Sequence, residues 1–129
     1  MNTTCYACSV ANHNDLSIYI SGGNNYRKTL ATVYRYNIKS DEWDSEIPAM
    51  NEPRQFHSSC LLINKLFVFG GRLENAYLES IEMLNVTDPE CSWELFYDDS
   101  SVFTPRAEAS VYATDDSHIL IMGGSQSGN

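Results

Sequence analysis

An apolar run that ends in a pair of glycines occurs three times in this chain of 129 residues. The runs read IYISGG, LFVFGG and ILIMGG, and they end at Gly23, Gly71 and Gly124. The second pair follows the first by 48 residues, and the third follows the second by 53. A period of this length is typical of proteins built by repeating one supersecondary unit. We therefore interpret the glycines as part of a repeat.

Three further features recur between the glycine pairs, always in the same order. Thirteen residues after each of the first two pairs comes a large residue followed by asparagine. A tryptophan comes next, and a proline–arginine pair then opens the following unit. The residues that carry these features are Tyr36 and Leu84, Trp43 and Trp93, and Arg54 and Arg106. The shared order indicates two full units and the beginning of a third.

Each unit has the spacing of four short strands. In the second unit, residues 56–63 and 66–71 are strand-like and are separated by Asn64 and Lys65, which suit a tight turn. Residues 80–86 and 92–97 supply two more strands, and no segment keeps a helical period over about ten residues. Four antiparallel strands repeated about every 50 residues are the pattern of a β-propeller blade.

The run WDSEIPAMNEPRQFHSSCLLINKLFVFGG, residues 43–71, closely resembles the kelch repeat. The resemblance implies an all-β fold, made of four-stranded antiparallel blades of a kelch-type β-propeller whose ring is incomplete. It divides residues 1–129 into a repeat over about 4–49, a second over about 50–101 and a half repeat over about 103–129. The implied structural repeat residues are Gly22, Gly23, Tyr36, Trp43, Gly70, Gly71, Trp93, Gly123 and Gly124.

The sequence departs from the usual kelch pattern at three positions. Leu84 stands where tyrosine is usual, and Asn37 and Asn85 stand where aspartate is usual. A closed propeller takes roughly four to eight blades, more than the two and a half implied here. We expect further propeller blades to come from a longer parent chain, and self-assembly of several copies into a ring is the alternative.

The charge balance disfavours two classes of partner. Acidic residues outnumber basic ones 17 to 8, so the net charge is −9, which repels nucleic acid and anionic membrane surfaces. Ten of the acids fall within residues 41–52 and 88–99, around the tryptophans, where we expect a solvated blade edge. The chain shows neither a signal peptide nor an apolar run of membrane-spanning length, which predicts a cytoplasmic protein.

The residues that could carry chemistry form no recognisable catalytic or metal site. Cys5 and Cys8 have a metal-like spacing, but in an extended strand their side chains would point to opposite faces. His13, His57 and His118 are scattered, and the glycines near the C-terminus lack the lysine of a phosphate loop. We expect no cofactor, no metal and no catalytic residues. The alternative is that the parent protein is a kelch-like enzyme, similar to galactose oxidase or to a sialic acid epimerase.

The resemblance places a partner-binding face on two classes of loop. One class follows the glycine pairs, at residues 24–31 and 72–79, and the other leads into each new unit. Tyrosine, arginine and asparagine in these loops suit a protein or peptide partner, and the basic residues suit an acidic peptide. The predicted contact residues are Tyr26, Arg27, Arg54, Arg72, Asn75, Tyr77 and Arg106, with a structural role for Arg54 and Arg106 as the alternative. The family implies an interaction scaffold, such as a ubiquitin-ligase substrate adaptor or an actin-associated protein.

Overall fold

The structure is a computed structural model, and it describes residues 4–44, 46–88, 90–96 and 103–126. The first sheet contains β1 (Ser9–His13), β2 (Ser17–Ser21), β3 (Val33–Asn37) and β4 (Glu42–Asp44), paired in that order. Neighbouring strands are antiparallel, and Tyr36 of β3 lies opposite Trp43 of β4. The first sheet is therefore a simple meander, as expected for a propeller blade.

The second sheet repeats this arrangement, and the connection between its second and third strands forms a short hairpin. Its strands are β5 (Ser58–Leu62), β6 (Lys65–Phe69), β9 (Ile81–Asn85) and β10 (Glu94–Leu95), and the order across the sheet is β5-β6-β9-β10. Ser58 pairs with Phe69 just as Ser9 pairs with Ser21, so the two sheets share one register. A two-stranded hairpin of β7 (Arg72–Leu73) and β8 (Ala76–Tyr77) is inserted between β6 and β9.

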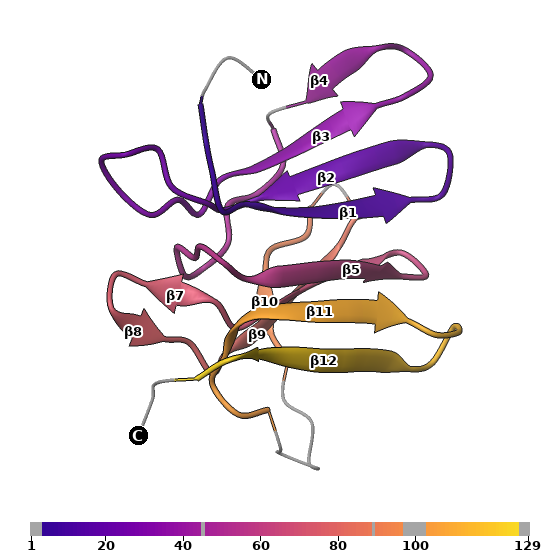
Figure 1. The fold of residues 1–129 in the computed structure, drawn as a ribbon. Helices are drawn as coiled ribbons and strands as arrows, with labels where there is room; N and C mark the ends of the chain where they lie inside the picture. Colours follow the sequence, from indigo (N-terminus) through magenta and orange to yellow (C-terminus); the bar gives the residue numbers. More distant parts are fainter. Residues whose placement is uncertain (1–3, 45, 89, 97–102, 127–129) are drawn as a thin grey trace.

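The third unit consists of β11 (Ala107–Ala113) and β12 (Ile119–Ser125), which form a two-stranded antiparallel sheet. The three sheets are stacked, with β1, β5 and β11 side by side along one edge of the stack (Figure 1). Backbone hydrogen bonds join the three units. The N–H of Phe56 donates to the carbonyl of Ala7 at 2.9 Å, and the N–H of Glu108 donates to the carbonyl of Phe56 at 2.8 Å. None of the described residues is helical, and the predicted all-β fold is confirmed.

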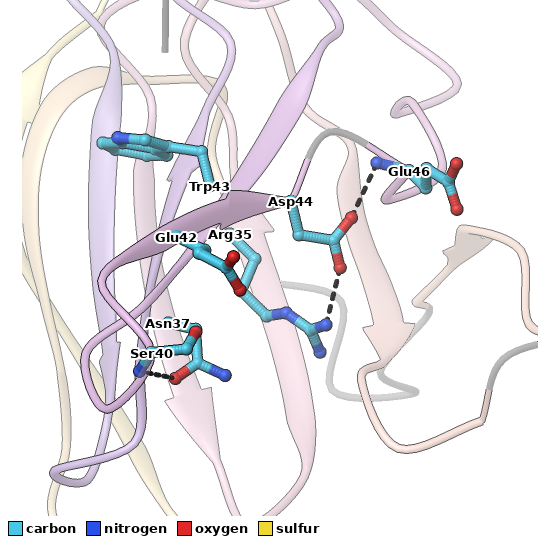
Figure 2. A pocket seen from close by; sticks show the side chains of 7 residues that line it. All are labelled: Arg35, Asn37, Ser40, Glu42, Trp43, Asp44 and Glu46. Atoms are coloured by element: carbon cyan, nitrogen blue, oxygen red, sulfur yellow. Dashed lines mark hydrogen bonds and ion pairs between the residues drawn. The ribbon is translucent and has the colours of Figure 1, made fainter.

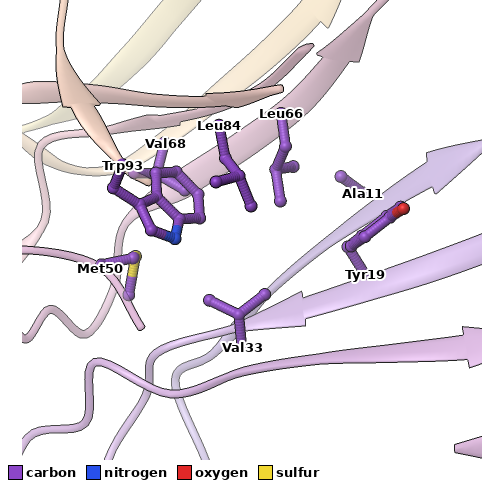
Figure 3. Close-up of a cluster of buried hydrophobic side chains, with 8 residues drawn as sticks. All are labelled: Ala11, Tyr19, Val33, Met50, Leu66, Val68, Leu84 and Trp93. Atoms are coloured by element: carbon purple, nitrogen blue, oxygen red, sulfur yellow. The ribbon is translucent and has the colours of Figure 1, made fainter. Parts of the chain in front are cut away.

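Two apolar layers separate the three sheets. Between the first and second sheets lie Tyr19 and Val33 on one side and aliphatic side chains of β6 and β9 on the other (Figure 3). The complete cluster is Ala11, Tyr19, Val33, Met50, Leu66, Val68, Leu84 and Trp93. A second cluster, of Cys60, Phe67 and Phe69, packs against residues of β11 and β12. Alternate residues of β6 thus face opposite neighbours, which explains its uninterrupted apolar sequence.

The glycine pairs lie where the next unit passes close to the end of β2 or β6. Gly70 has a φ of +55°, which favours glycine, and a Cβ there would overlap the carbonyl oxygen of Arg106. The neighbouring Gly71 donates its N–H to that same carbonyl at 2.8 Å. In the first unit, Gly23 donates to the carbonyl of Arg54 in the same way, also at 2.8 Å. The first two pairs are therefore close backbone junctions between consecutive units.

The two tryptophans occupy equivalent positions but differ in burial. Trp93 is 5% exposed, packs against the first sheet, and donates its indole N–H to the carbonyl of Pro48 at 2.7 Å. Trp43 is 43% exposed and packs on Tyr36 of its own sheet, with the ring centroids 5.0 Å apart. Since each tryptophan faces the preceding sheet, Trp43 faces the side of the first sheet that carries no neighbour. The acidic residues Asp98 and Asp99, predicted to lie at a blade edge, are outside the described residues.

Candidate partner-binding surface

The two predicted classes of loop meet at one end of the stack, opposite the tight hairpin turns (Figure 1). Tyr6, just before β1, pairs with Asn24, just after the first glycine pair, through hydrogen bonds of 3.0 and 2.9 Å. In the second unit, Gln55 and Arg72 pair in the same way at 3.0 and 2.8 Å. We call this end, made of residues 4–8, 24–31, 53–56 and 72–79, the loop surface.

Two asparagines shape the first half of the loop surface. Asn24 accepts a hydrogen bond from the backbone of Tyr26 at 2.8 Å, and Asn25 accepts from Arg27 and Lys28 at 3.2 and 3.0 Å. Asparagine side chains commonly stabilise turns in this way. Tyr26 adopts a φ of +68° and remains 77% exposed. The turn thus projects an aromatic ring beside two exposed basic side chains.

The ring of Tyr26 contacts a second exposed aromatic ring. It lies against the ring of Tyr6, which is also exposed, with a centroid separation of 4.9 Å and a tilt of 46°. Arg27 and Lys28 follow directly in sequence and are exposed as well. The first half of the loop surface therefore combines two accessible aromatic rings with the positive charges of Arg27 and Lys28, and tyrosine and arginine are enriched at protein interfaces.

The β7–β8 hairpin forms the second half of the loop surface. Arg72 lies opposite Tyr77, and its guanidinium carbon is 5.1 Å from the centre of the Tyr77 ring, a cation–π geometry. Both side chains are half-buried, whereas Asn75 at the tip is exposed. The Tyr77 hydroxyl lies 3.5 Å from the hydroxyl of Ser125 on β12. The sequence predicted only a loop here, because each of these strands is two residues long.

Arg54 belongs to the 53–56 segment of the loop surface, but its side chain lies inside the second blade, contrary to the predicted contact role. Its side chain is fully buried, and it donates to the carbonyl of Gly70 at 2.8 Å and to a carboxylate oxygen of Glu82 at 2.6 Å. It also donates to the carbonyl and hydroxyl of Ser80. These contacts tie the entry of the second unit to the ends of β6 and β9, which corresponds to the structural alternative.

Glu82 is the counterpart that the sequence did not identify. Its second oxygen accepts the backbone N–H of Asn51 at 2.7 Å, and its first accepts that of Glu52 at 3.0 Å. The signal was present, because Glu82 alternates with Leu84 on the buried face of β9. A charged residue at such a position requires a buried partner.

Arg106 repeats part of the Arg54 arrangement in the third unit. It donates to the carbonyl of Gly123 at 3.0 Å, just as Arg54 donates to that of Gly70, and to the carbonyl of Thr104 at 3.2 Å. Its side chain is half-buried, at the edge of the two-stranded sheet. The equivalent contacts favour a blade-linking role for Arg106 over a role in partner contact.

A groove lies along the outer edge of the first sheet (Figure 2). Arg35 and Asp44 form an ion pair of 2.6 Å in it, and Asp44 also accepts the backbone N–H of Glu46 at 2.9 Å. Asn37 accepts the N–H of Ser40 at 3.1 Å. The lining residues are Arg35, Asn37, Ser40, Glu42, Trp43, Asp44 and Glu46. The Asp44 carboxylate and the Asn37 amide oxygen are thus engaged in local hydrogen bonds, as in an ordinary sheet edge.

The histidines are not assembled into a site. Burial, together with the charge of Arg54, lowers the pKa of His57 to about 3, so this side chain is neutral and hydrogen-bonded to Ser21 at 2.8 Å. His118 is exposed and contacts Asp115 at 3.0 Å. Within the described residues, no three His, Cys, Asp or Glu side chains are grouped as a metal site would require. The same part of the chain contains no helix long and apolar enough to span a membrane.

Cys5 and Cys8 lie outside the strand in which the sequence placed them. The prediction put them on opposite faces of a strand, but the described strand β1 begins only at Ser9. Ala7 has a φ of +54°, so the side-chain alternation of an extended chain does not hold between the two cysteines. Burial, together with the neighbouring Cys8, raises the pKa of Cys5.

Stacked four-stranded meanders joined through their first strands define blades of a β-propeller whose ring is not closed within this chain. The family model described as the KLHDC2/KLHL20/DRC7 Kelch-repeats domain matches residues 2–129. The chain therefore belongs to the kelch-repeat family, as the sequence motifs predicted.

Three relatives illustrate the range of similar proteins. Kelch-like protein 21 of Danio rerio is 40% identical over 41% of this chain, and Kelch-like protein 41a of the same species is 33% identical over 68%. The Rho GTPase-activating protein gacHH of Dictyostelium discoideum is 33% identical over 93% of this chain. The matched regions are short parts of these proteins, at 8%, 14% and 8% of their respective lengths.

Proposed function

We propose that this chain is a protein-interaction module that binds a partner protein or peptide through the loop surface. The observation that carries the proposal is the exposed Tyr6–Tyr26 pair, held beside Arg27 and Lys28 by the Asn24 and Asn25 side chains. Exposed aromatic and arginine side chains are the groups that most often dominate binding energy at interfaces. Loops that are fixed by a rigid scaffold are also the usual place for recognition.

The partner chemistry that fits best is an acidic peptide. Arg27, Lys28 and Arg72 supply three of the eight basic residues of a chain whose net charge is −9. The first half of the loop surface, residues 4–8 and 24–31, carries Arg27 and Lys28 and no acid, whereas Glu74 and Glu79 lie in the second half. A locally positive surface on a negatively charged protein steers acidic partners towards it. Tyr77 contributes an aromatic ring that is already oriented by Arg72. Asn75, exposed at the hairpin tip, adds an amide that can both donate and accept hydrogen bonds.

In the parent protein, the proposed role is that of a cytoplasmic scaffold without enzymatic activity of its own. The Kelch-like proteins among its relatives support a substrate adaptor of a ubiquitin ligase or an actin-associated protein. The alternative is an enzyme built on the same propeller, similar to galactose oxidase or a sialic acid epimerase. Sequencing the transcript on both sides of these residues separates the two, since an adaptor requires an additional recruitment domain and an oxidase requires metal ligands from further blades.

We also propose that further kelch blades of a longer parent chain cover the two outer faces of the stack. On the first sheet, Val10 and Trp43 are exposed at positions whose counterparts in the second unit, Ser59 and Trp93, are buried. On the last sheet, Tyr112, Leu120 and Met122 form an exposed row. Apolar rows of this kind are favourable interfaces for another sheet. Light scattering gives the mass of the chain in solution and so distinguishes a monomer from a self-assembled ring. A ring of several copies would contradict the proposal that blades of a longer chain cover these faces.

The binding proposal is tested with two sets of fluorescent peptides of matched length. One set carries glutamate and aspartate, and the other carries glutamine and asparagine in their place. Fluorescence anisotropy should detect tighter binding of the acidic set, with an affinity that falls as salt rises. Alanine at both Arg27 and Lys28 should weaken this binding, whereas Lys65→Ala, at the exposed start of β6, should not. Equal binding of both peptide sets would refute the acidic-partner proposal.

A further inference from the structure

The linker into the third unit carries a threonine directly before its proline–arginine pair, at Thr104, Pro105 and Arg106. Of the four prolines in the chain, Pro105 alone follows a serine or threonine. Thr104 is exposed and lies in neither a helix nor a strand, and a residue before proline is restricted to extended backbone. The preceding residue is anchored, since the ring of Phe103 lies 6.3 Å from that of Phe69. Thr104 is therefore an accessible residue on an extended, anchored segment.

The second unit has an acid at the position equivalent to Thr104. The carbonyls of Arg54 and Arg106 each accept a hydrogen bond of 2.8 Å from the second glycine of the preceding unit. Each arginine side chain also donates to the carbonyl of the first glycine of its own unit. These contacts align Arg106 with Arg54, and therefore Thr104 with Glu52.

Glu52 shows what a negative group does at this position. A carboxylate oxygen of Glu52 lies 3.6 Å from the guanidinium of Arg54 and also accepts a hydrogen bond from the Ser80 hydroxyl. The Glu52 side chain is 41% exposed, whereas that of Arg54 is fully buried. An acid one residue before the proline–arginine pair thus reaches the arginine from the solvent side of the blade.

Arg106 lacks a partner of this kind. In the described ranges, the salt bridges of the chain involve Arg35, Arg54 and His118, and none involves Arg106. The Arg106 Nε donates to the carbonyl of Thr104 at 3.2 Å, so the guanidinium lies beside residue 104. A phosphate on threonine carries a charge of about −1.5 to −2 at pH 7, and its oxygens match the planar donors of a guanidinium.

The surroundings of other exposed hydroxyl residues are less suitable for a phosphate. The Ser117 hydroxyl bonds to the carboxylate of Asp115 at 2.9 Å. The Thr87 hydroxyl bonds to the side chain of Asn85 at 2.9 Å and is followed in sequence by Asp88. A phosphate next to a carboxylate is repelled, whereas a phosphate next to an arginine gains charge-assisted hydrogen bonds.

We propose that Thr104 is a phosphorylation site of a proline-directed serine/threonine kinase, and that the phosphate pairs with the guanidinium of Arg106. In this reaction the Thr104 hydroxyl oxygen attacks the γ-phosphorus of ATP. The bond from that phosphorus to the bridging oxygen breaks, ADP leaves, and the hydroxyl proton passes to the catalytic base of the kinase. The phosphate then occupies the place that the Glu52 carboxylate takes in the second unit.

Pairing with the phosphate would strengthen the junction between the second and third units. The backbone of Arg106 already accepts a hydrogen bond from Gly71 of the second unit, and its side chain binds the carbonyl of Gly123 in the third. The phosphate would hold the same guanidinium from the solvent side. This effect does not involve Arg27 or Lys28, so the proposal does not depend on the proposed binding function.

The site is tested by incubating the full chain with MgATP and a purified proline-directed kinase of the mitogen-activated class. The chain should gain the mass of one phosphate. Trypsin releases Thr104 in the peptide 73–106, and fragmentation of this peptide should place the phosphate on Thr104. The Thr104→Val variant should take up none. An unmodified Thr104 in the wild-type chain, with or without phosphate elsewhere, would overturn the proposal.

Thermal unfolding tests the role of Arg106. Phosphorylation should raise the melting temperature of the wild-type chain by about 3 °C, and the gain should shrink as salt rises. The Arg106→Gln variant should accept the phosphate without this gain. A phosphorylated wild-type chain that melts at the same or a lower temperature would overturn the pairing, as would an equal gain in Arg106→Gln.

A carboxylate at position 104 provides a test that needs no kinase. Thr104→Glu should melt at a higher temperature than the uncharged Thr104→Gln, because glutamate restores the arrangement of Glu52 and Arg54. The two variants should melt at the same temperature when Arg106→Gln is also present. Equal melting of Thr104→Glu and Thr104→Gln in the otherwise wild-type chain would contradict the pairing, whether or not Arg106→Gln folds.

Discussion

The Nη2 atom of Arg54 and the Oε1 atom of Glu82 lie 2.6 Å apart, and both side chains are fully buried. The pair joins the entry of the second unit to β9, and each partner also binds backbone groups of the segment that it meets. A buried charge is tolerated only when its partners are in place. This arrangement therefore ties the linker between the two blades to the body of the second blade.

Removal of one member of the Arg54–Glu82 pair should be strongly destabilising. Glu82→Ala leaves the buried guanidinium with only the longer ion pair to Glu52, at 3.6 Å, and breaking a buried pair typically costs about 3–5 kcal/mol. Asp44→Ala removes the partner of Arg35 from a surface ion pair of the same length, and should cost no more than about 1 kcal/mol. Urea denaturation gives both values. Similar costs for the two variants would contradict a structural role for Arg54.

Replacement of the junction glycines should separate a backbone effect from a steric one. Gly70→Ala puts a methyl group against the carbonyl of Arg106 and 2.9 Å from the Phe103 ring, in a left-handed backbone conformation. Gly123→Ala has the same conformational penalty, with a φ of +68°, but nothing lies within 4 Å of the new methyl group. Gly123→Ala should cost about 1 kcal/mol and Gly70→Ala clearly more. Thermal unfolding measures the stability of both variants. An equal loss of stability in Gly70→Ala and Gly123→Ala would argue against a close backbone junction at Gly70.

The two equivalent tryptophans should differ in their contribution to stability. Trp93→Ala removes a buried side chain from the layer between the first two sheets and should cost about 3–5 kcal/mol. Trp43→Ala removes a partly exposed side chain and should cost much less in this chain. In a longer parent chain that covers the first sheet, the cost of Trp43→Ala should rise towards that of Trp93→Ala. Urea denaturation of this chain and of the longer parent chain tests this. An equal cost of Trp43→Ala in the two proteins would contradict a blade that covers the first sheet.

His57 should make the stability of the chain depend on pH below neutrality. Its pKa is lowered to about 3 in the folded protein from an ordinary value of 6.5. As the pH falls from 7 to 5, the unfolded chain takes up a proton that the folded chain does not, so stability is lost; above pH 7 this contribution is fully present. The loss from this histidine between pH 7 and 5 should be about 2 kcal/mol.

The measurement compares the free energy of unfolding at pH 7 and pH 5 in three proteins. The wild-type chain and the His118→Gln variant should show the same decrease, because His118 is exposed. The His57→Gln variant should show a decrease smaller by about 2 kcal/mol. An identical pH dependence in all three proteins would show that His57 is not held neutral by burial.

Local motifs predicted the blades well because glycine pairs and tryptophans mark strand ends that depend on near neighbours. The order of β1 to β4 and the placement of Gly70 followed directly from that pattern. Contacts that depend on single backbone angles could not be predicted. The left-handed conformation of Ala7, which ends the strand alternation expected for Cys5 and Cys8, has no signal in the residue type.

The predicted contact residues divide according to what surrounds them in three dimensions. Tyr26 and Arg27 lie exposed on the loop surface, where the loop classes meet. Arg54 is in a loop of the same kind by sequence, but the distant Glu82 draws its side chain into the blade. The pairing of β9 with β6 places Glu82 beside the end of β6, where the Arg54 side chain also binds the carbonyl of Gly70.

Reversing the charges of the loop surface, and then those of its peptide ligand, tests the central claim most directly. The doubly substituted chain with Arg27→Glu and Lys28→Glu should bind an acidic peptide at least about tenfold more weakly than the wild-type chain, a change of about 1.4 kcal/mol. It should bind the same peptide with lysine in place of the acids more tightly than the wild-type chain does. Lys65→Glu, at the opposite end of the stack, should change neither affinity. Equal affinity of the double variant and the wild-type chain for both peptides, measured by calorimetry, would contradict recognition through the loop surface.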